Sequence, residues 1–209
     1  MPVAVRKRKP TSHCSSPCNA CGGASEPEER AEFIGFLQWA GSEAVVRVVM
    51  RKQGSGKLVH IGSRSGFEGE PGVSLYCASK FAVAGISEAL SVEMAPFGIQ
   101  SMVVEPGVFR TDFLDASSLS VAANRIADYD DTPAHVTLDW IDRANHAQLG
   151  DPVKGAALIV EAASTEKLPT HLYLGRDTLE RLDVKYQQVQ DDLAPWREKS
   201  AATAHEDAA

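Results

Sequence analysis

Tyr76 and Lys80 lie four residues apart in the stretch SLYCASK, which spans residues 74–80. On a helix, residues i and i+4 share one face, so the two side chains would be neighbours. An ammonium group beside a phenol favours the phenolate and lowers the pKa of the tyrosine toward the pH at which enzymes work. The pair could therefore act as a general acid and base. The spacing alone also suits an ordinary exposed pair on a helix.

Ser63 ends the apolar stretch KLVHIGS and stands thirteen residues before Tyr76. Ligands of α/β proteins bind at the carboxyl ends of the strands, which is where a hydroxyl at this position would lie. The residues between Ser63 and Tyr76 let the chain turn back, because they include Gly66, Gly69, Pro71 and Gly72. Taken by itself, Ser63 is better explained as a residue that caps its own loop.

Strand and helix patterns alternate along the chain after residue 56. Short apolar runs predict three strands, and apolar residues at spacings of three and four predict the helices between them. The expected strands are 57–62, 99–104 and 170–174, and the expected helices are 74–95, 152–164 and a last, polar-faced helix that is broken or ended at Pro195. The long stretch 108–150 reads as irregular. This order predicts an α/β fold with a parallel sheet.

The composition is that of one globular domain, with 209 residues of which 44% are hydrophobic. The net charge of −7 gives no general reason to expect nucleic acid or an anionic membrane as a partner. No apolar run approaches the ~20 residues of a membrane span, and no apolar stretch follows the basic start as in a secretory signal. We expect a soluble, cytoplasmic protein.

The expected domain plan is a disordered segment over 1–30, a folded domain over 31–199 and a disordered tail over 200–209. Four possible zinc ligands lie together in the first segment, namely His13, Cys14, Cys18 and Cys21. Their spacing fits no common zinc pattern, which favours an unstructured, reduced tail over a metal site. The basic run 6–9 could direct nuclear import, but a simply solvated run is the more common case.

Residues 56–113 resemble the central catalytic segment of the short-chain dehydrogenase/reductase family. Several motifs occur in the family's order: a serine thirteen residues before the tyrosine, YCASK, an Ala/Gly-rich helix, APFGI and EPGVFRT. The resemblance weakens after residue 113 and returns in the last helices and strand, so it covers roughly residues 45–200. It implies part of a Rossmann-like, doubly wound parallel sheet.

The resemblance also implies roles for the three residues already discussed. Tyr76 corresponds to the general acid that protonates a carbonyl oxygen during reduction and acts as the base in the reverse direction. Lys80 corresponds to the lysine that holds the nicotinamide ribose hydroxyls, and Ser63 to the serine that orients the substrate oxygen. The substrate would be a small-molecule alcohol or carbonyl compound whose identity stays open.

The loop EPGVFRT corresponds to the segment that lines the nicotinamide of NAD or NADP and contacts its amide and phosphates. The matching positions, which join Tyr76 and Lys80 as cofactor-binding candidates, are Pro106, Gly107, Val108 and Thr111. Residues 113–150 correspond to the family's substrate lid, and the cofactor would supply the hydride chemistry. We predict no metal-binding residues.

The family's Gly-rich pyrophosphate turn, T-G-x-x-x-G-x-G, does not occur in the sequence, and residues 31–52 contain no counterpart of the family's catalytic asparagine. We therefore expect the N-terminal nucleotide-binding half to be missing, the strand ending at Ser63 to be an exposed edge, and cofactor binding by these residues to be poor. The predicted function is NAD(P)-dependent oxidoreduction by a truncated member. The alternative is an inactive member that acts only by association, for example as a homo-oligomer through the helix at 77–94.

Overall fold

The computed structural model describes residues 48–115, 118 and 126–205. The expectations for the N-terminal segment, including the cysteine cluster and the basic run, lie outside these residues. Residues 48–53 are helical and lead through a turn into the first strand. None of the described helices is long and apolar enough to cross a membrane.

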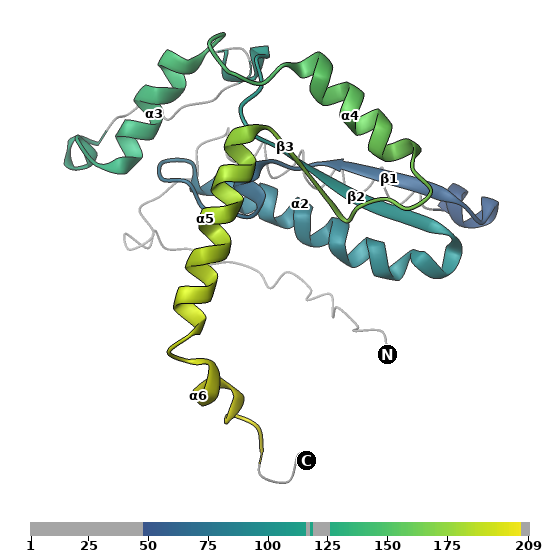
Figure 1. Cartoon of the computed structure of the whole chain (residues 1–209). Helices are drawn as coiled ribbons and strands as arrows, with labels where there is room; N and C mark the ends of the chain where they lie inside the picture. The colour runs from purple at the N-terminus through teal and green to yellow at the C-terminus, as the bar shows by residue number, and fades with distance from the viewer. Residues whose placement is uncertain (1–47, 116–117, 119–125, 206–209) are drawn as a thin grey trace, which may run out of the picture.

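Three parallel strands form the sheet in the described part of the chain, in the order β1 (Gly56–Ile61), β2 (Ile99–Pro106) and β3 (His171–Leu174). Helix α2 (Ser74–Glu93) connects β1 to β2, and α4 (Pro152–Ser164) precedes β3. Figure 1 shows α2 on one side of the sheet and α4 on the other. The parallel pairing confirms the predicted α/β class, and the helices expected at 74–95 and 152–164 are present as α2 and α4.

The core lies on both faces of β2, which is the central strand. On the α4 face, Met102 and Val104 pack against Leu174 and neighbours in and after α4. On the α2 face, Ile99 packs with Leu58 of β1 and with two residues at the end of α2, Leu90 and Met94. Because side chains alternate between the faces of a strand, one strand supplies both clusters. Among the described residues β1 is an edge strand, and its Ile61 is 54% exposed.

A polar triad interrupts the apolar packing between α2 and the sheet. His60 Nδ1 lies 3.1 Å from the Ser87 hydroxyl and 3.3 Å from the Ser101 hydroxyl, and the two hydroxyls are 3.1 Å apart. All three side chains are buried. The sequence pattern predicted an apolar strand at 57–62. The structure instead places His60 beside Leu58 on the buried face, where serines of α2 and β2 meet its hydrogen-bonding needs.

The stretch 108–150 is more regular than predicted. It contains two short 3-10 turns, η3 (Asp112–Leu114) and η4 (Ala127–Tyr129), and the twelve-residue helix α3 (Pro133–Ala144). Helix α3 was missed because its apolar residues Val136, Leu138 and Trp140 alternate with polar ones, a spacing that does not single out a helix; in the structure it buries His135 and Ile141. We call the stretch 108–150 the excursion. Its two ends meet, because Phe109 pairs with Gly150 in an isolated bridge.

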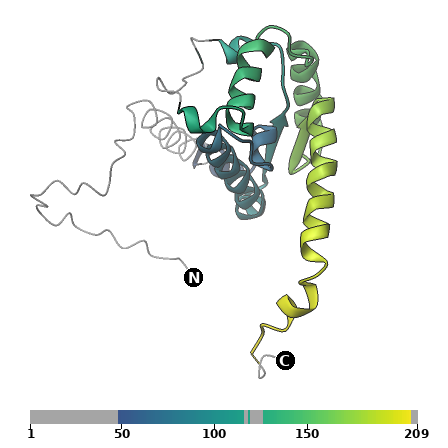
Figure 2. The ribbon, with the colours of Figure 1, turned by 90° about the vertical axis from the view of Figure 1, so that its left-hand side faces the viewer.

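The C-terminal part begins with α5 (Arg176–Leu193) and continues into α6 (Arg197–Ala201). The break near Pro195 agrees with the predicted end of the polar helix, and α6 extends to residue 201, just beyond the expected start of the tail. Figures 1 and 2 both show α5 running away from the sheet, with its N-terminal end beside the strand ends. Two further 3-10 turns, η1 (Arg64–Gly66) and η2 (Ala95–Phe97), follow β1 and α2.

Candidate active site

Ser63 lies directly after β1, at the edge where the carboxyl ends of the parallel strands meet. Its side chain is buried, and its Oγ accepts a hydrogen bond of 3.2 Å from the Ser65 N–H, which caps η1. The loop-capping role considered from the sequence is therefore present. Because a hydroxyl can also donate one hydrogen bond, the capping contact leaves the donor of Ser63 for another group.

Tyr76 and Lys80 share one face of the first turns of α2. The Lys80 Nζ lies 5.6 Å from the centre of the Tyr76 ring and donates a hydrogen bond of 3.2 Å to the carbonyl of Ile61, the last residue of β1. The ammonium is thus held between the tyrosine and the strand that Ser63 follows. Both side chains are partly buried. The Lys80 ammonium therefore lies beside the Tyr76 ring, at the strand ends.

The ring of Phe113 lies beside the ring of Tyr76. The two ring centres are 5.9 Å apart with planes inclined by 48°, and Phe113 is about half exposed. The turn that carries Phe113 is capped by Thr111, whose Oγ1 accepts a hydrogen bond of 3.3 Å from the Phe113 N–H. Thr111 itself is exposed. An apolar ring thus adjoins the phenol on the side of the excursion.

The loop after β2 is held by backbone hydrogen bonds. Gly107 N–H donates to the Leu174 carbonyl at 2.8 Å, which keeps the end of β2 against β3. Val108 uses both of its backbone groups within the chain: its N–H donates to Asp177 Oδ2 at 2.9 Å, and its carbonyl accepts from Gly150 N–H at 3.0 Å. A ligand contact by Val108 would therefore come from its side chain. Pro106 ends β2 beside this loop.

Arg64 and Glu70 form an ion pair in the loop that carries Ser63. Arg64 Nη2 lies 2.8 Å from Glu70 Oε2, and the Ser65 hydroxyl also donates to the Glu70 carboxylate. Burial alone would raise the pKa of Glu70, but the hydrogen bonds from Arg64 and Ser65 outweigh it and lower the pKa below its usual value. The sequence analysis did not single out Arg64, although its place directly after Ser63 was a usable signal.

We expect Glu70→Gln to destabilise the fold at neutral pH by about 1–3 kcal/mol, because it leaves the half-buried Arg64 without its closest carboxylate. A carboxyl whose pKa is lower in the folded state contributes stability above its unfolded value, near 4.5, and loses it as the pH falls through the folded pKa. The difference between variant and wild type should therefore shrink below about pH 4.5. Urea unfolding at several pH values measures it, with the exposed Glu180→Gln as the control. A pH-independent difference would contradict the prediction.

Glu105 is a buried carboxylate directly before Pro106. One of its oxygens accepts from His171 Nδ1 at 3.0 Å, and the other, Oε1, has no hydrogen-bond partner. Burial raises the pKa of Glu105, and His171 only partly offsets the effect. Burial and the nearby Glu105 also raise the pKa of Tyr173 to about 12. Sequence reasoning passed over Glu105 because it stands in a strand that otherwise reads as apolar.

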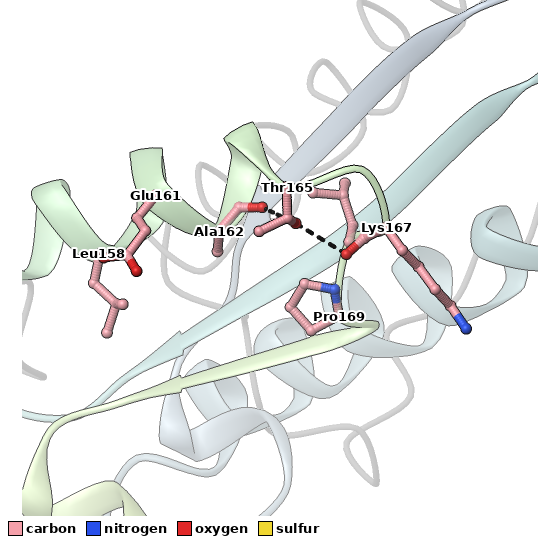
Figure 3. Close-up of a pocket in the computed structure, with 7 residues that line it drawn as sticks. Leu158, Glu161, Ala162, Thr165, Lys167 and Pro169 are labelled. Carbon is pink, nitrogen blue, oxygen red and sulfur yellow. Dashed lines mark hydrogen bonds between the residues drawn. The ribbon is translucent and has the colours of Figure 1, made fainter.

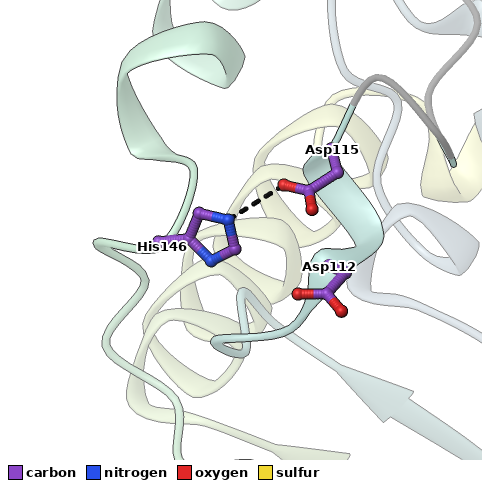
Figure 4. Close-up of side chains that lie close together, drawn as sticks. All are labelled: Asp112, Asp115 and His146. Carbon is purple, nitrogen blue, oxygen red and sulfur yellow. Dashed lines mark ion pairs between the residues drawn. The ribbon is translucent and has the colours of Figure 1, made fainter.

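Asp112, Asp115 and His146 lie together near the two ends of the stretch 108–150 (Figure 4). His146 Nε2 is 3.0 Å from Asp115 Oδ1, and the Asn145 side-chain amide donates to the same oxygen. The three side chains are partly or fully exposed. These contacts tie η3 to the end of α3, so the cluster connects the two ends of the excursion.

A shallow groove of about 420 Å³ lies at the opposite end of the sheet. It is formed by the end of α4 and the loop before β3, as Figure 3 shows, and its apolar lining includes Leu158, Ala162, Leu168 and Pro169. Pro169 stands at the amino end of β3, whereas Ser63 and Pro106 stand at carboxyl ends. The groove is therefore separate from the site around Tyr76.

Comparison with known proteins places this arrangement in a family. The sequence model of the family described as short chain dehydrogenase matches residues 39–121, which include Ser63, Tyr76, Lys80 and the loop after β2. These residues match the short-chain dehydrogenase family. The prediction of this family from the sequence motifs is thus confirmed, and the likeness of the folds supports it.

Two curated relatives of this chain are oxidoreductases. Oxidoreductase BOA17 of Botryotinia fuckeliana is 30% identical over 78% of this chain and 58% of its own length. The uncharacterised oxidoreductase YusZ of Bacillus subtilis is 34% identical over 70% of this chain and 51% of its own length. The chain thus spans about half the length of these relatives.

Solved structures show the same fold. A short-chain dehydrogenase from Streptomyces avermitilis superposes with a TM-score of 0.65 at 36% identity, over 75% of this chain and 55% of that one. A family member from Burkholderia phymatum, solved in complex with NAD, superposes with a TM-score of 0.54 at 18% identity, over 68% of this chain and 50% of that one. The second likeness shows the fold alone.

Proposed function

We propose that this chain carries the catalytic half of an NAD(P)-dependent oxidoreductase that interconverts an alcohol and a carbonyl compound. The observation that carries the proposal is the placement of Tyr76 and Lys80 at the carboxyl ends of the strands. There the Lys80 ammonium lies 5.6 Å from the centre of the Tyr76 ring and donates a hydrogen bond to the Ile61 carbonyl. The match of these residues to the short-chain dehydrogenase family supports it.

In the proposed reaction, the Tyr76 hydroxyl donates a proton to the carbonyl oxygen as reduction proceeds, and takes it back in the oxidation. The positive charge of Lys80 favours the phenolate that remains after the transfer. The free donor of Ser63 stabilises the negative charge that develops on the substrate oxygen. A bound nicotinamide cofactor would supply or accept the hydride.

The residues proposed to hold the cofactor are Lys80 and the loop after β2. The ammonium of Lys80 lies at the carboxyl ends of the strands, and ribose hydroxyls are suitable acceptors for the N–H donors of an ammonium. Pro106, Gly107, the Val108 side chain and Thr111 would line the nicotinamide ring. We propose a small-molecule alcohol or carbonyl substrate with an apolar part, because Phe113 presents a half-exposed ring beside Tyr76.

The second candidate, association without catalysis, is favoured by the exposed face of α2. Ala78, Phe81, Gly85 and Val92 lie on one side of the helix, where Phe81 is 45% and Val92 75% exposed. A Cβ at Gly85 would meet no atom within 4 Å, so another backbone could approach closely there. We propose that this face mediates pairing of two copies, with or without activity.

The deciding experiment uses a chimera, because the sequence contains no T-G-x-x-x-G-x-G turn. The segment of the Streptomyces avermitilis dehydrogenase that precedes the matched region is joined to residues 39–209. We expect this chimera to oxidise NADPH or NADH in the presence of apolar aldehydes and ketones, whereas residues 1–209 alone bind either cofactor poorly. A folded chimera that binds NADPH and turns over none of a broad carbonyl panel would overturn the proposed function. Self-association of residues 1–209 would then favour the second candidate.

A further inference from the structure

One carboxylate joins the two loops that carry the candidate site. Asp177 lies in the first turn of α5. Its Oδ2 accepts hydrogen bonds from the Val108 N–H at 2.9 Å and from Arg64 Nη1 at 3.1 Å. Val108 belongs to the loop after β2, and Arg64 directly follows Ser63 in the loop after β1. Asp177 therefore contacts both chain segments that extend from the carboxyl ends of the neighbouring strands.

The chain is shaped closely around this carboxylate. A Cβ at Gly107 would lie 2.2 Å from both oxygens of Asp177, so the carboxylate would have to move. A Cβ at Gly175 would lie 2.6 Å from Oδ1, and Gly175 also adopts a φ of +100° that side-chain-bearing residues rarely adopt. Two glycines thus leave the space that the carboxylate needs to reach the Val108 amide.

Arg64 is itself held on its other side. Its second guanidinium nitrogen pairs with Glu70, and its side chain is only 18% exposed. Burial alone would lower the pKa of Arg64, but Glu70 and Asp177 raise it, so the guanidinium stays charged. Charge-assisted hydrogen bonds of a planar guanidinium are directional, which makes Arg64 a stiff connection between the loop of Ser63 and α5.

We propose that Asp177 and Arg64 are positioning residues that hold the loop of Ser63 and the Val108 loop at a fixed separation beside Tyr76. The catalytic effect of this connection rests on the proposed function, whereas the hydrogen bonds that make it are a property of the fold. It sets where the Ser63 hydroxyl stands relative to the residues that would line the nicotinamide. Small misplacements of such groups slow a reaction strongly, because the reacting atoms must approach within a narrow range.

The first test measures hydrogen exchange of the Val108 amide in residues 1–209 by NMR, which needs no cofactor. We expect Asp177→Ala to speed this exchange about tenfold or more, because the carboxylate is the acceptor of that N–H. Asp177→Asn should speed it less, since an amide oxygen can still accept. The exchange of Met102 in the core should not change. Asp183→Ala, an exposed aspartate on the same helix, is the matched control.

A second variant tests the hydrogen bond between the Val108 N–H and Asp177 independently. Gly107→Ala places a methyl group where the carboxylate now lies, so it should also expose the Val108 amide to exchange. Unchanged Val108 protection in a folded Asp177→Ala protein would overturn the connection. Unchanged protection of the Val108 amide in a folded Gly107→Ala protein would contradict the connection as well.

The second test separates positioning from a purely structural role, in the active chimera. We expect Asp177→Ala to lower kcat at least tenfold at a temperature where its unfolding curve shows that it is folded, with Asp177→Asn recovering part of the loss and Asp183→Ala leaving kcat unchanged. A lost amide protection together with an unchanged kcat would overturn the positioning role. If the unsubstituted chimera has no activity, the proposed function fails, and the exchange experiment still decides whether the connection exists.

Discussion

Tyr76→Phe is expected to lower kcat of the active chimera by roughly 10²–10⁴-fold, the range typical for loss of a general acid or base. The substitution keeps the ring, so its contact with Phe113 and its place beside Lys80 should persist. Only the proton donor is removed. Steady-state kinetics with NADPH and an apolar ketone measures the effect.

The matched control for this prediction is Tyr186→Phe, because Tyr186 is 63% exposed on α5 and lies outside the site. It should leave kcat unchanged. Cofactor binding by the Tyr76→Phe chimera, followed by NADPH fluorescence, should stay close to that of the parent. A variant that retained more than about a tenth of the parent kcat would remove Tyr76 from the role of proton donor.

Met102→Ala is expected to destabilise the fold by about 2–5 kcal/mol, which corresponds to a shift of at least 30-fold in the folding equilibrium. Met102 is fully buried in the middle of β2 and packs with residues of β3 and α4. Removing its side chain leaves a cavity that a central strand, bonded on both edges, cannot close by moving.

Urea unfolding followed by circular dichroism measures this loss for residues 1–209. The control is Val160→Ala, because Val160 is 65% exposed on α4 and its truncation should change stability by no more than about 0.5 kcal/mol. Equal effects of the two substitutions would mean that the α4 face of β2 is not the core described above.

Local patterns in the sequence were sufficient for the fold class. The apolar runs at 57–62, 99–104 and 170–174 have the length of strands, and crossover helices between them force a parallel arrangement. The same reasoning failed for α3, because Val136, Leu138 and Trp140 alternate with polar residues and do not single out a helix. It also missed His60, whose burial depends on serines that are distant in sequence.

By itself, the sequence determined the family, the parallel α/β architecture and the neighbourhood of Tyr76 and Lys80, since a helical spacing of four fixes that pair locally. Only the tertiary structure decided that Lys80 reaches the Ile61 carbonyl, that Phe113 stands against Tyr76, and that Asp177 joins the loops of Ser63 and Val108. Arg64 and Asp177 are 113 residues apart. No local pattern encodes such a contact, because it arises only when the strands align and bring their carboxyl ends to one edge.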